Sequence, residues 1–326
     1  MKYSPFFSPE VCLRLFRIKR ILCCILVTFV IGCLISLSSL TPDECHCNGE
    51  PSKQQYHLNN KGHKLGIVVP FRDRFEELLE FVPHLHNFLN AQNLNHAIYV
   101  INQVDQYRFN RASLINVGFT MAVTEGGCDY IAMHDVDLLP MNPLLSYAYP
   151  HNGLFHVASP QLHPRYHYST FVGGILLVKR EDFEKVNGMS NKYWGWGLED
   201  DEFFVRLKEA GLNISRPGNL TSGIEGTFRH MHDRVWRKRD MAKCYNQREV
   251  TRRRDRMTGL NDVKYIIQSK YKLTINTASV DVINVALKCN RTMTPWCLCS
   301  EENKSSTGYS KNSKDKLKQK NSKSVR

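Results

Sequence analysis

Apolar and polar residues alternate in blocks along the middle of the chain, and these blocks predict secondary structure. Four short apolar runs predict buried strands, at 65–70, 97–102, 130–133 and 174–178. Apolar residues at helical spacing predict three helices, at 76–89, 111–124 and 199–210. Strands that alternate with helices in this way indicate an α/β domain with a mostly parallel sheet.

A longer apolar run near the N-terminus predicts a different kind of element. Ile21–Leu40 contains twenty residues without a charge or a proline, enough for a helix to cross a hydrocarbon core of about 30 Å. A cleaved signal peptide is the alternative, but the run exceeds a usual signal-peptide core and no small-residue cleavage site follows it. Basic residues between Arg14 and Arg20 precede the run, which predicts a cytosolic N-terminus and a lumenal remainder. We therefore expect a single-pass type II protein, with a cytosolic tail at 1–20 and a transmembrane signal anchor at 21–40.

Two polar segments lack the pattern of a folded domain. Residues 41–63 contain prolines, Asn and Gln with only scattered apolar residues, and they predict a flexible stem. Residues 301–326 are rich in Lys, Ser and Asn, and they predict a disordered basic tail. The folded lumenal domain is therefore expected at 64–300.

The net charge of +13 first suggests a protein that binds polyanions such as nucleic acids. Residues 1–20 contribute +4 and residues 301–326 contribute +5, which leaves +4 for everything between them. Within that part, Arg229–Arg256 contains eleven Lys and Arg against four acidic residues. We expect no nucleic-acid partner, because this segment is predicted to be lumenal. A solvated helix with one or two phosphate-facing arginines explains the segment instead.

The 11 cysteines agree with an oxidising compartment. Cys289 and Cys297 bracket a short loop and are the pair that we expect to form a disulfide, with Cys299 as the competing partner. A zinc site is the weaker interpretation, since no second pair of this kind accompanies the Cys-Leu-Cys segment.

Two segments carry side chains that suit a divalent cation. The sequence HDVDLLP at 134–140 follows a predicted strand, and the carboxyl ends of such strands are where α/β sheets bind ligands. In RHMHD at 229–233, His230 and His232 are two residues apart and would point to the same side of an extended segment. With Asp137 they form a mixed oxygen and nitrogen set, which suits Mn²⁺ better than Mg²⁺ or Ca²⁺. A surface turn and surface histidines are the alternatives.

The third informative segment, YWGWGLEDDEFFVRL at 193–207, combines aromatic residues, glycines and acids. An aromatic face is a common platform for a sugar ring, and glycines give the loop conformational freedom. Four acidic residues in a row, 199–202, begin the predicted helix. The helix dipole accounts for two of them, and a carboxylate beside the loop suits a general base that deprotonates a sugar hydroxyl.

Six segments together resemble a known family in order and spacing: PFRDR (70–74), FNRA (109–112), HDVDLLP, FVGGILLV (171–178), WGWGLEDDEF (194–203) and RHMHD. The set resembles the β-1,4-galactosyltransferases over about residues 63–299, and it is most similar to the branch that acts on xylose. The resemblance implies a GT-A glycosyltransferase fold, which is a Rossmann-like α/β domain with a nucleotide half and an acceptor half.

The resemblance also implies which residues bind the donor, UDP-galactose. These are Pro70, Phe71, Arg72, Asp73, Arg74, Phe109, Asn110, Arg111, Val136, Asp137, Tyr166, Trp196, His230, Met231, His232 and Arg239. Aromatic rings in this set offer faces for uracil, and the arginines offer forks for ribose or phosphate. The implied cofactor is Mn²⁺, held by Asp137, His230 and His232.

The acceptor side is implied in the same way. The acceptor residues are Tyr168, Leu198, Glu199, Asp200 and Asp201, with Asp200 as the catalytic base. Leu198 stands where some members have arginine, which leaves this one acceptor contact open. Packing in the core explains Tyr168 equally well.

The resemblance implies Mn²⁺-dependent, inverting transfer of galactose to the 4-hydroxyl of xylose on proteoglycan core proteins, at the Golgi membrane. Members that act on N-acetylglucosamine use a methionine as one metal ligand, whereas this chain has His-Met-His. Transfer to N-acetylglucosamine is the alternative within the enzyme class. A noncatalytic glycan-binding module is a further alternative, but it would lose the base or a metal ligand, and this chain retains Asp137, His230, His232 and Asp200.

Overall fold

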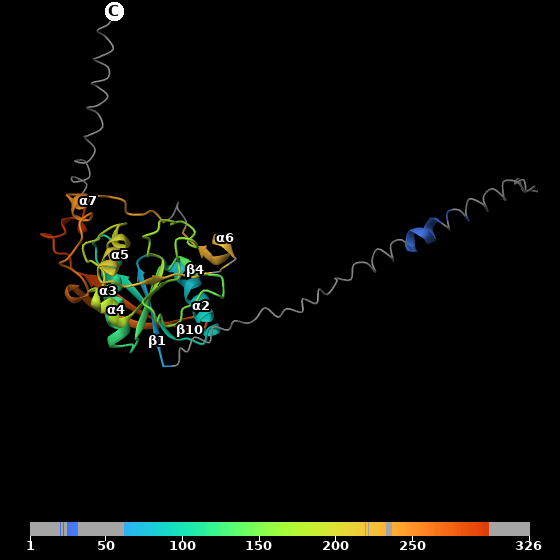
Figure 1. Cartoon of the computed structure of the whole chain (residues 1–326), viewed down its shortest axis with the longest axis horizontal. Coiled ribbons are helices and arrows are strands. Elements are labelled where there is room, and N and C mark those ends of the chain that lie inside the picture. The colour runs from blue at the N-terminus through green and yellow to red at the C-terminus, as the bar shows by residue number, and fades with distance from the viewer. Residues whose placement is uncertain are drawn as a thin grey trace, which may run out of the picture. The chain divides into compact units, whose positions relative to one another are not determined.

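The computed structural model describes residues 20, 22, 25–31, 62–218, 220, 222–232 and 237–299. The predicted basic tail, most of the predicted membrane span and nearly all of the predicted stem lie outside these residues. Residues 25–31 are helical, and no helix within the described part of the chain is long and apolar enough to span a membrane. The folded domain lies between residues 62 and 299 (Figure 1).

The elements predicted from apolar periodicity are all present, with bounds that differ by a few residues at most. The four strands are β1 (Lys64–Phe71), β2 (Asn95–Gln103), β3 (Tyr130–His134) and β6 (Ile175–Lys179). The three helices are α2 (Phe75–Ala91), α3 (Arg111–Thr124) and α5 (Glu199–Glu209). The periodic part of the pattern therefore predicted the centre of the fold.

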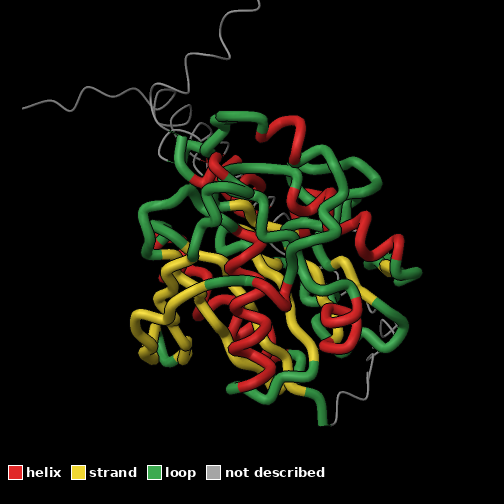
Figure 2. The backbone as a smooth tube through the Cα atoms, turned by 90° about the vertical axis from the view of Figure 1, so that its left-hand side faces the viewer, coloured by secondary structure: helices red, strands yellow, loops and turns green. Residues whose placement is uncertain are grey.

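Shorter or less periodic elements complete the domain. The further strands are β4 (Leu138–Pro140), β5 (Leu154–His156), β7 (Ile214–Ser215), β8 (Phe228–His230), β9 (Tyr265–Ile275) and β10 (Ala278–Leu287). The further helices are α4 (Arg180–Lys185), α6 (Gly223–Thr227), α7 (Gln247–Val250), η1 (Leu260–Asp262) and η2 (Pro295–Cys297). Figure 2 shows the strands crossing the lower half of the domain and long loops covering its upper half.

The main sheet has eight strands in the order β7-β5-β6-β3-β1-β2-β10-β9. Strand β1 pairs in parallel with both β2 and β3, and β10 pairs in parallel with β2. Strands β3 and β6 are antiparallel, as are β10 and β9. Strand β5 is antiparallel to β6 and parallel to β7. The sheet is therefore mixed, with parallel pairs at its centre and at the β7 edge.

Two apolar clusters sandwich this sheet, and β1 contributes to both by alternation. Leu65, Ile67 and Val69 belong to one cluster, whereas Val68 belongs to the other. The second cluster contains most of α3, which is buried nearly all round. Gly118 allows this close approach, since a Cβ there would lie 2.3 Å from Val68.

Candidate active site

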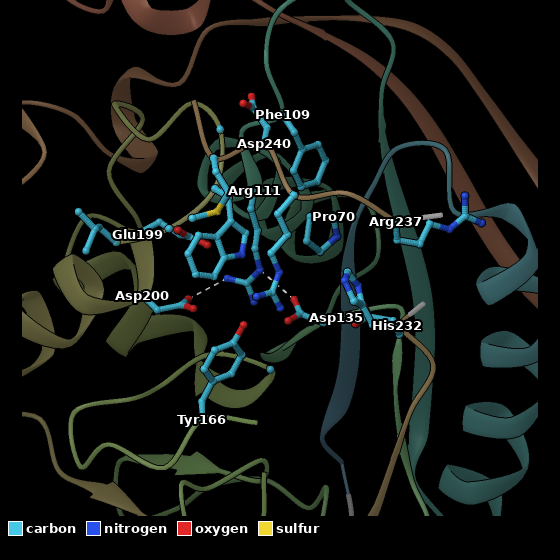
Figure 3. Close-up of a pocket in the computed structure, with 18 of the residues that line it drawn as sticks. Pro70, Phe109, Arg111, Asp135, Tyr166, Glu199, Asp200, His232, Arg237 and Asp240 are labelled. Carbon is cyan, nitrogen blue, oxygen red and sulfur yellow. Dashed lines mark hydrogen bonds and ion pairs between the residues drawn. The ribbon is translucent and has the colours of Figure 1, made fainter. Parts of the chain in front are cut away.

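The site lies where the carboxyl ends of neighbouring strands meet. Strands β1 and β3 run in parallel, so Pro70 at the end of one and Asp135 just after the other come to the same edge of the sheet. Loops before α3 and α5 and the segment that follows β8 complete the wall of a cavity of about 780 Å³ (Figure 3). A ligand at this edge would contact segments from most of the domain.

Most of the predicted donor-binding residues line this cavity. They are Pro70, Arg72, Asp73, Arg74, Phe109, Arg111, Val136, Asp137, Tyr166, Trp196, His230, His232 and Arg239. The acceptor residues Tyr168, Leu198, Glu199, Asp200 and Asp201 line it too. Segments more than 150 residues apart in the sequence therefore form one site.

Three predicted residues are not part of the cavity wall, and each has a structural role instead. Alternation along β1 turns Phe71 into the core, where it is 8% exposed. Asn110 is fully buried and caps α3, because its side chain accepts a hydrogen bond from the backbone N–H of Ser113. Met231 packs against the core, and its backbone N–H donates to the carbonyl of Asp137. These three side chains do not line the cavity, and their contact with the donor stays a prediction.

Arg72 lines the cavity, but its guanidinium forms hydrogen bonds with the protein backbone. It donates to three backbone carbonyls in the loop after β2, those of Gln103, Asp105 and Tyr107, at 2.7–3.1 Å. Its Cζ atom lies 6.0 Å from the centroid of the Phe109 ring. Arg72 therefore shapes the loop that presents Phe109 to the cavity.

Asp137, His230 and His232 converge at the side of the cavity next to the small β4–β8 ladder. Leu138 pairs with His230 in that ladder, which brings the two segments together. The Oδ2 atom of Asp137 lies 3.3 Å from Nδ1 of His232 and 3.8 Å from Nε2 of His230. The two imidazole rings are stacked with centroids 5.6 Å apart, so both face the same carboxylate as the two-residue spacing predicts.

The chemistry of these three side chains fits a divalent cation. Burial lowers the pKa of His230 to about 4, so this imidazole is neutral near pH 7 and has a lone pair to offer. One carboxylate and two imidazoles suit Mn²⁺. No three His, Cys, Asp or Glu side chains of the described residues are already arranged as a metal cluster. A bound cation would replace the hydrogen bond between His232 and Asp137.

The loop between α4 and α5 carries the aromatic residues. Gly195 and Gly197 have φ angles of 81° and 100°, which explains the glycines on both sides of Trp196. Leu198 has a φ of 77°, an unfavourable value for a branched side chain, at the residue that caps α5. The Trp196 ring is 39% exposed and lies under Arg239, whose Cζ atom is 4.7 Å from the ring centroid. Arg239 also lies 5.8 Å from the centroid of Tyr166.

Arg111 forms ion pairs with carboxylates from two segments, one after β3 and one at the start of α5. Arg111 donates through Nε to Asp135 at 2.8 Å and through Nη1 to Asp200 at 2.9 Å, as the dashed lines in Figure 3 show. Burial raises the pKa of Asp200 to about 7, and the charges of Glu199 and Asp135 add to the rise while Arg111 opposes it. Burial also raises the pKa of Glu199. A carboxylate with a pKa near neutrality is suited to accept a proton.

Sequence reasoning missed two residues that shape this part of the site. Asp135 is the first carboxylate of Asp-Val-Asp and is the second partner of Arg111. Gly173 leaves room for the base, since a Cβ there would lie 2.4 Å from Oδ2 of Asp200. The Gly-Gly pair directly before the apolar run of β6 was the available signal for this close approach.

Two disulfides fix the C-terminal part of the domain. The predicted bond between Cys289 and Cys297 is confirmed. Cys299 does not compete for Cys289, because it forms a second disulfide with Cys244, across 55 residues of sequence. This second bond connects the segment after Arg239 to the C-terminal end of the described domain.

Comparisons with known proteins agree with this site. Residues 50–149 match the model for the N-terminal region of glycosyl transferase group 7, and residues 153–233 match the model described as the N-terminal domain of galactosyltransferase. The chain is 59% identical to β-1,4-galactosyltransferase 7 of Drosophila melanogaster over 252 residues, which are 77% of this chain and 78% of that protein. The chain belongs to the β-1,4-galactosyltransferase family.

One further relative and two crystal structures are also similar to this chain. The xylosylprotein 4-β-galactosyltransferase of Caenorhabditis elegans is 52% identical, over 74% of this chain and 84% of that protein. The crystal structure of the catalytic domain of the Drosophila enzyme in complex with xylobiose has a TM-score of 0.71 at 58% identity, and covers 73% of this chain and 100% of that chain. The same values hold for a mutant of that enzyme in complex with manganese, UDP-Gal and xylobiose. The predicted GT-A-like mixed α/β fold is thus confirmed.

Proposed function

We propose that this protein transfers galactose from UDP-α-galactose to the 4-hydroxyl of xylose on proteoglycan core proteins, with inversion and with Mn²⁺ as cofactor. The observation that carries the proposal is that Asp200, with a pKa near 7, lies in one cavity with the Asp137, His230 and His232 set. The complex of the similar Drosophila enzyme with manganese, UDP-Gal and xylobiose supports the choice of donor, metal and acceptor.

In this proposal the donor lies along the edge formed by the ends of β1 and β3. Phe109 offers a ring face to the uracil, and Arg239 offers a positive charge to the diphosphate. Asp137, His230 and His232 hold the cation, which when bound supplies positive charge next to the departing diphosphate. Trp196 covers the sugars from the side of its glycine-flanked loop.

The chemical step needs one base and no covalent intermediate. Asp200 accepts the proton of the xylose 4-hydroxyl, and the oxygen attacks the anomeric carbon of galactose from the face opposite UDP. The bond from that carbon to the phosphate oxygen breaks, and UDP departs with the electron pair. A single displacement converts the α-linkage of the donor into a β-linkage. Arg111 orients the Asp200 carboxylate throughout, because it also holds Asp135.

We further propose that the apolar run at 21–40 anchors the chain in the Golgi membrane, with the catalytic domain in the lumen. The two disulfides support this location, because such bonds persist in oxidising compartments.

A transfer assay tests the proposed activity. The purified full-length chain is incubated with UDP-galactose and Mn²⁺, and a β-xyloside is compared with a β-N-acetylglucosaminide as acceptor. We expect transfer to the β-xyloside, and we expect the transfer to stop when the metal is chelated. A preference for the N-acetylglucosaminide would overturn the assignment of the acceptor.

A further inference from the structure

The cavity wall also includes basic residues that have no role in the proposed chemistry. They are Lys243, Arg248 and Arg252, which lie on and around the short helix α7, and Lys243 contacts the loop of Trp196. We call these three residues the basic rim. Among the acidic residues that line the cavity, Asp240 is the nearest to the basic rim in sequence. It forms an ion pair with Arg108 at 2.5 Å.

The basic rim differs from the other arginines of the same segment. Arg253, Arg254 and Arg256 each form an ion pair with a glutamate of the protein, at 2.5, 2.6 and 3.8 Å respectively. Arg248 and Arg252 are both exposed, and neither forms an ion pair with another described residue. Lys243 donates to the backbone carbonyl of Trp196 at 2.9 Å and also has no carboxylate partner among those residues. Between residues 243 and 256, the arginines that pair with glutamates do not line the cavity, whereas the three basic residues that line it form no ion pair with the described residues.

The backbone that carries the basic rim is held firmly against the loop of Trp196. Arg108 donates to the carbonyl of Ala242 at 2.7 Å and to the side chain of Gln247 at 2.9 Å. Gln247 donates in turn to the carbonyl of Trp194. The disulfide between Cys244 and Cys299 fixes the same stretch from the other side. A rim that is fixed in advance loses little entropy when it binds a ligand.

We infer that the basic rim binds acidic side chains of the polypeptide that carries the acceptor xylose. This inference rests on the proposed function. When the xylose lies between Trp196 and Asp200, the rest of the acceptor must leave the cavity, and the part attached to the sugar is a polypeptide. The cavity wall beyond Trp196 presents unpaired cations, so carboxylates next to the xylosylated residue are the complementary partner.

Steady-state kinetics of the full-length chain with matched acceptors tests this inference. One xylosylated peptide has acidic residues on both sides of the sugar, a second has glutamines in their place, and a β-xyloside without a peptide is the third acceptor. We expect the KM for the acidic peptide to be lower than that for the neutral peptide by about five- to tenfold at low salt. The difference should shrink as salt screens the charges.

Two double variants test whether the basic rim causes the preference for the acidic peptide. In Arg248→Gln/Arg252→Gln, we expect the KM for the acidic peptide to rise to that for the neutral peptide. Arg253→Gln/Arg256→Gln removes the same charge from the same segment outside the cavity, and we expect it to retain the preference. The β-xyloside measures folding and the chemical step in each variant.

Three outcomes would overturn the inference. Equal KM values for the two peptides in the wild-type chain, with transfer to the β-xyloside intact, would refute the peptide contact and leave the proposed function standing. Equal losses in both double variants would assign the effect to net charge instead of the basic rim. If peptide charge has no effect while a sulfated oligosaccharide inhibits only the chain with an intact rim, the rim binds a polysaccharide.

A chain that transfers galactose to no xyloside would refute the proposed function itself.

Discussion

Arg111 determines how the carboxylates of the site share their charge. It contacts Asp135 and Asp200 together, and Glu199 adds a further negative charge nearby. A single cation among these acids cannot neutralise all of them, so burial dominates and the pKa of Asp200 rises to about 7. Four acidic residues in a row predicted the place of the proposed base. Its raised pKa comes first from burial, which Arg111, 89 positions earlier in the sequence, opposes.

Asp200→Asn tests the role of this carboxylate. The amide keeps the shape of the side chain but cannot accept the proton, so we expect kcat to fall by roughly 10²–10⁴-fold. Binding of UDP in the presence of Mn²⁺, measured by calorimetry, should be retained. Full transfer activity in this variant would remove Asp200 from the role of base.

The pH dependence of the reaction provides a second test of the same residue. Asp200 works as a carboxylate, so its protonated form is inactive and kcat/KM should fall as the pH drops below about 7. The rate is measured with the β-xyloside at a fixed saturating concentration of Mn²⁺. A profile that is level through pH 7 and falls only near the ordinary pKa of an aspartate would contradict the perturbed environment described for Asp200.

Among single residues, the structure separates the predicted donor residues that line the cavity from those that support the scaffold. Phe71 and Asn110 belong to segments that line the cavity, yet alternation along β1 buries the first and helix capping occupies the second. Asp135 was missed because a motif does not say which of two carboxylates faces an arginine from another element. That contact depends on tertiary structure, which no local pattern contains.

Elements with strong periodicity were predicted closely, and elements without it were not. Helix α3 begins and ends at the predicted residues because its apolar positions and its Asn cap agree. The hairpin of β9 and β10 was not predicted, although β10 joins the sheet next to β2. Its strands are mixed in polarity because β9 lies at the edge, where much of one face meets solvent.

The segment around α7 depends on its disulfide more than on its own helix, which has only four residues. Cys244→Ser/Cys299→Ser opens a connection that spans 55 residues, and we expect the free energy of unfolding to fall by roughly 3–4 kcal/mol. Cys289→Ser/Cys297→Ser opens one of 8 residues and should cost about 1.5–2 kcal/mol less. Denaturant unfolding of both variants under non-reducing conditions measures the difference. Equal losses would show that loop length does not determine the contribution of these bonds.

At the scale of the whole molecule, the net charge of +13 is distributed unevenly along the chain. Most of it lies at the two ends of the chain, whereas the domain keeps its local positive charge at the cavity. The proposed orientation of the chain in the membrane rests on the basic cluster that precedes the apolar run.

Protease protection in sealed microsomes tests this orientation. We expect the catalytic domain to resist added protease until detergent opens the vesicles, because the proposed topology places it in the lumen. A control protein with a cytosolic domain should be digested in both conditions. Digestion of the catalytic domain in intact vesicles would exclude the proposed topology.

The bond between Cys244 and Cys299 has a consequence for where a competent molecule is made. Lys243, which contacts the carbonyl of Trp196, directly precedes Cys244, and the rest of the basic rim follows within eight residues. A chain that folds in a reducing compartment would keep both thiols and would lack this covalent support next to the rim. We therefore expect a chain made under reducing conditions to hold the basic rim less firmly than one made under oxidising conditions.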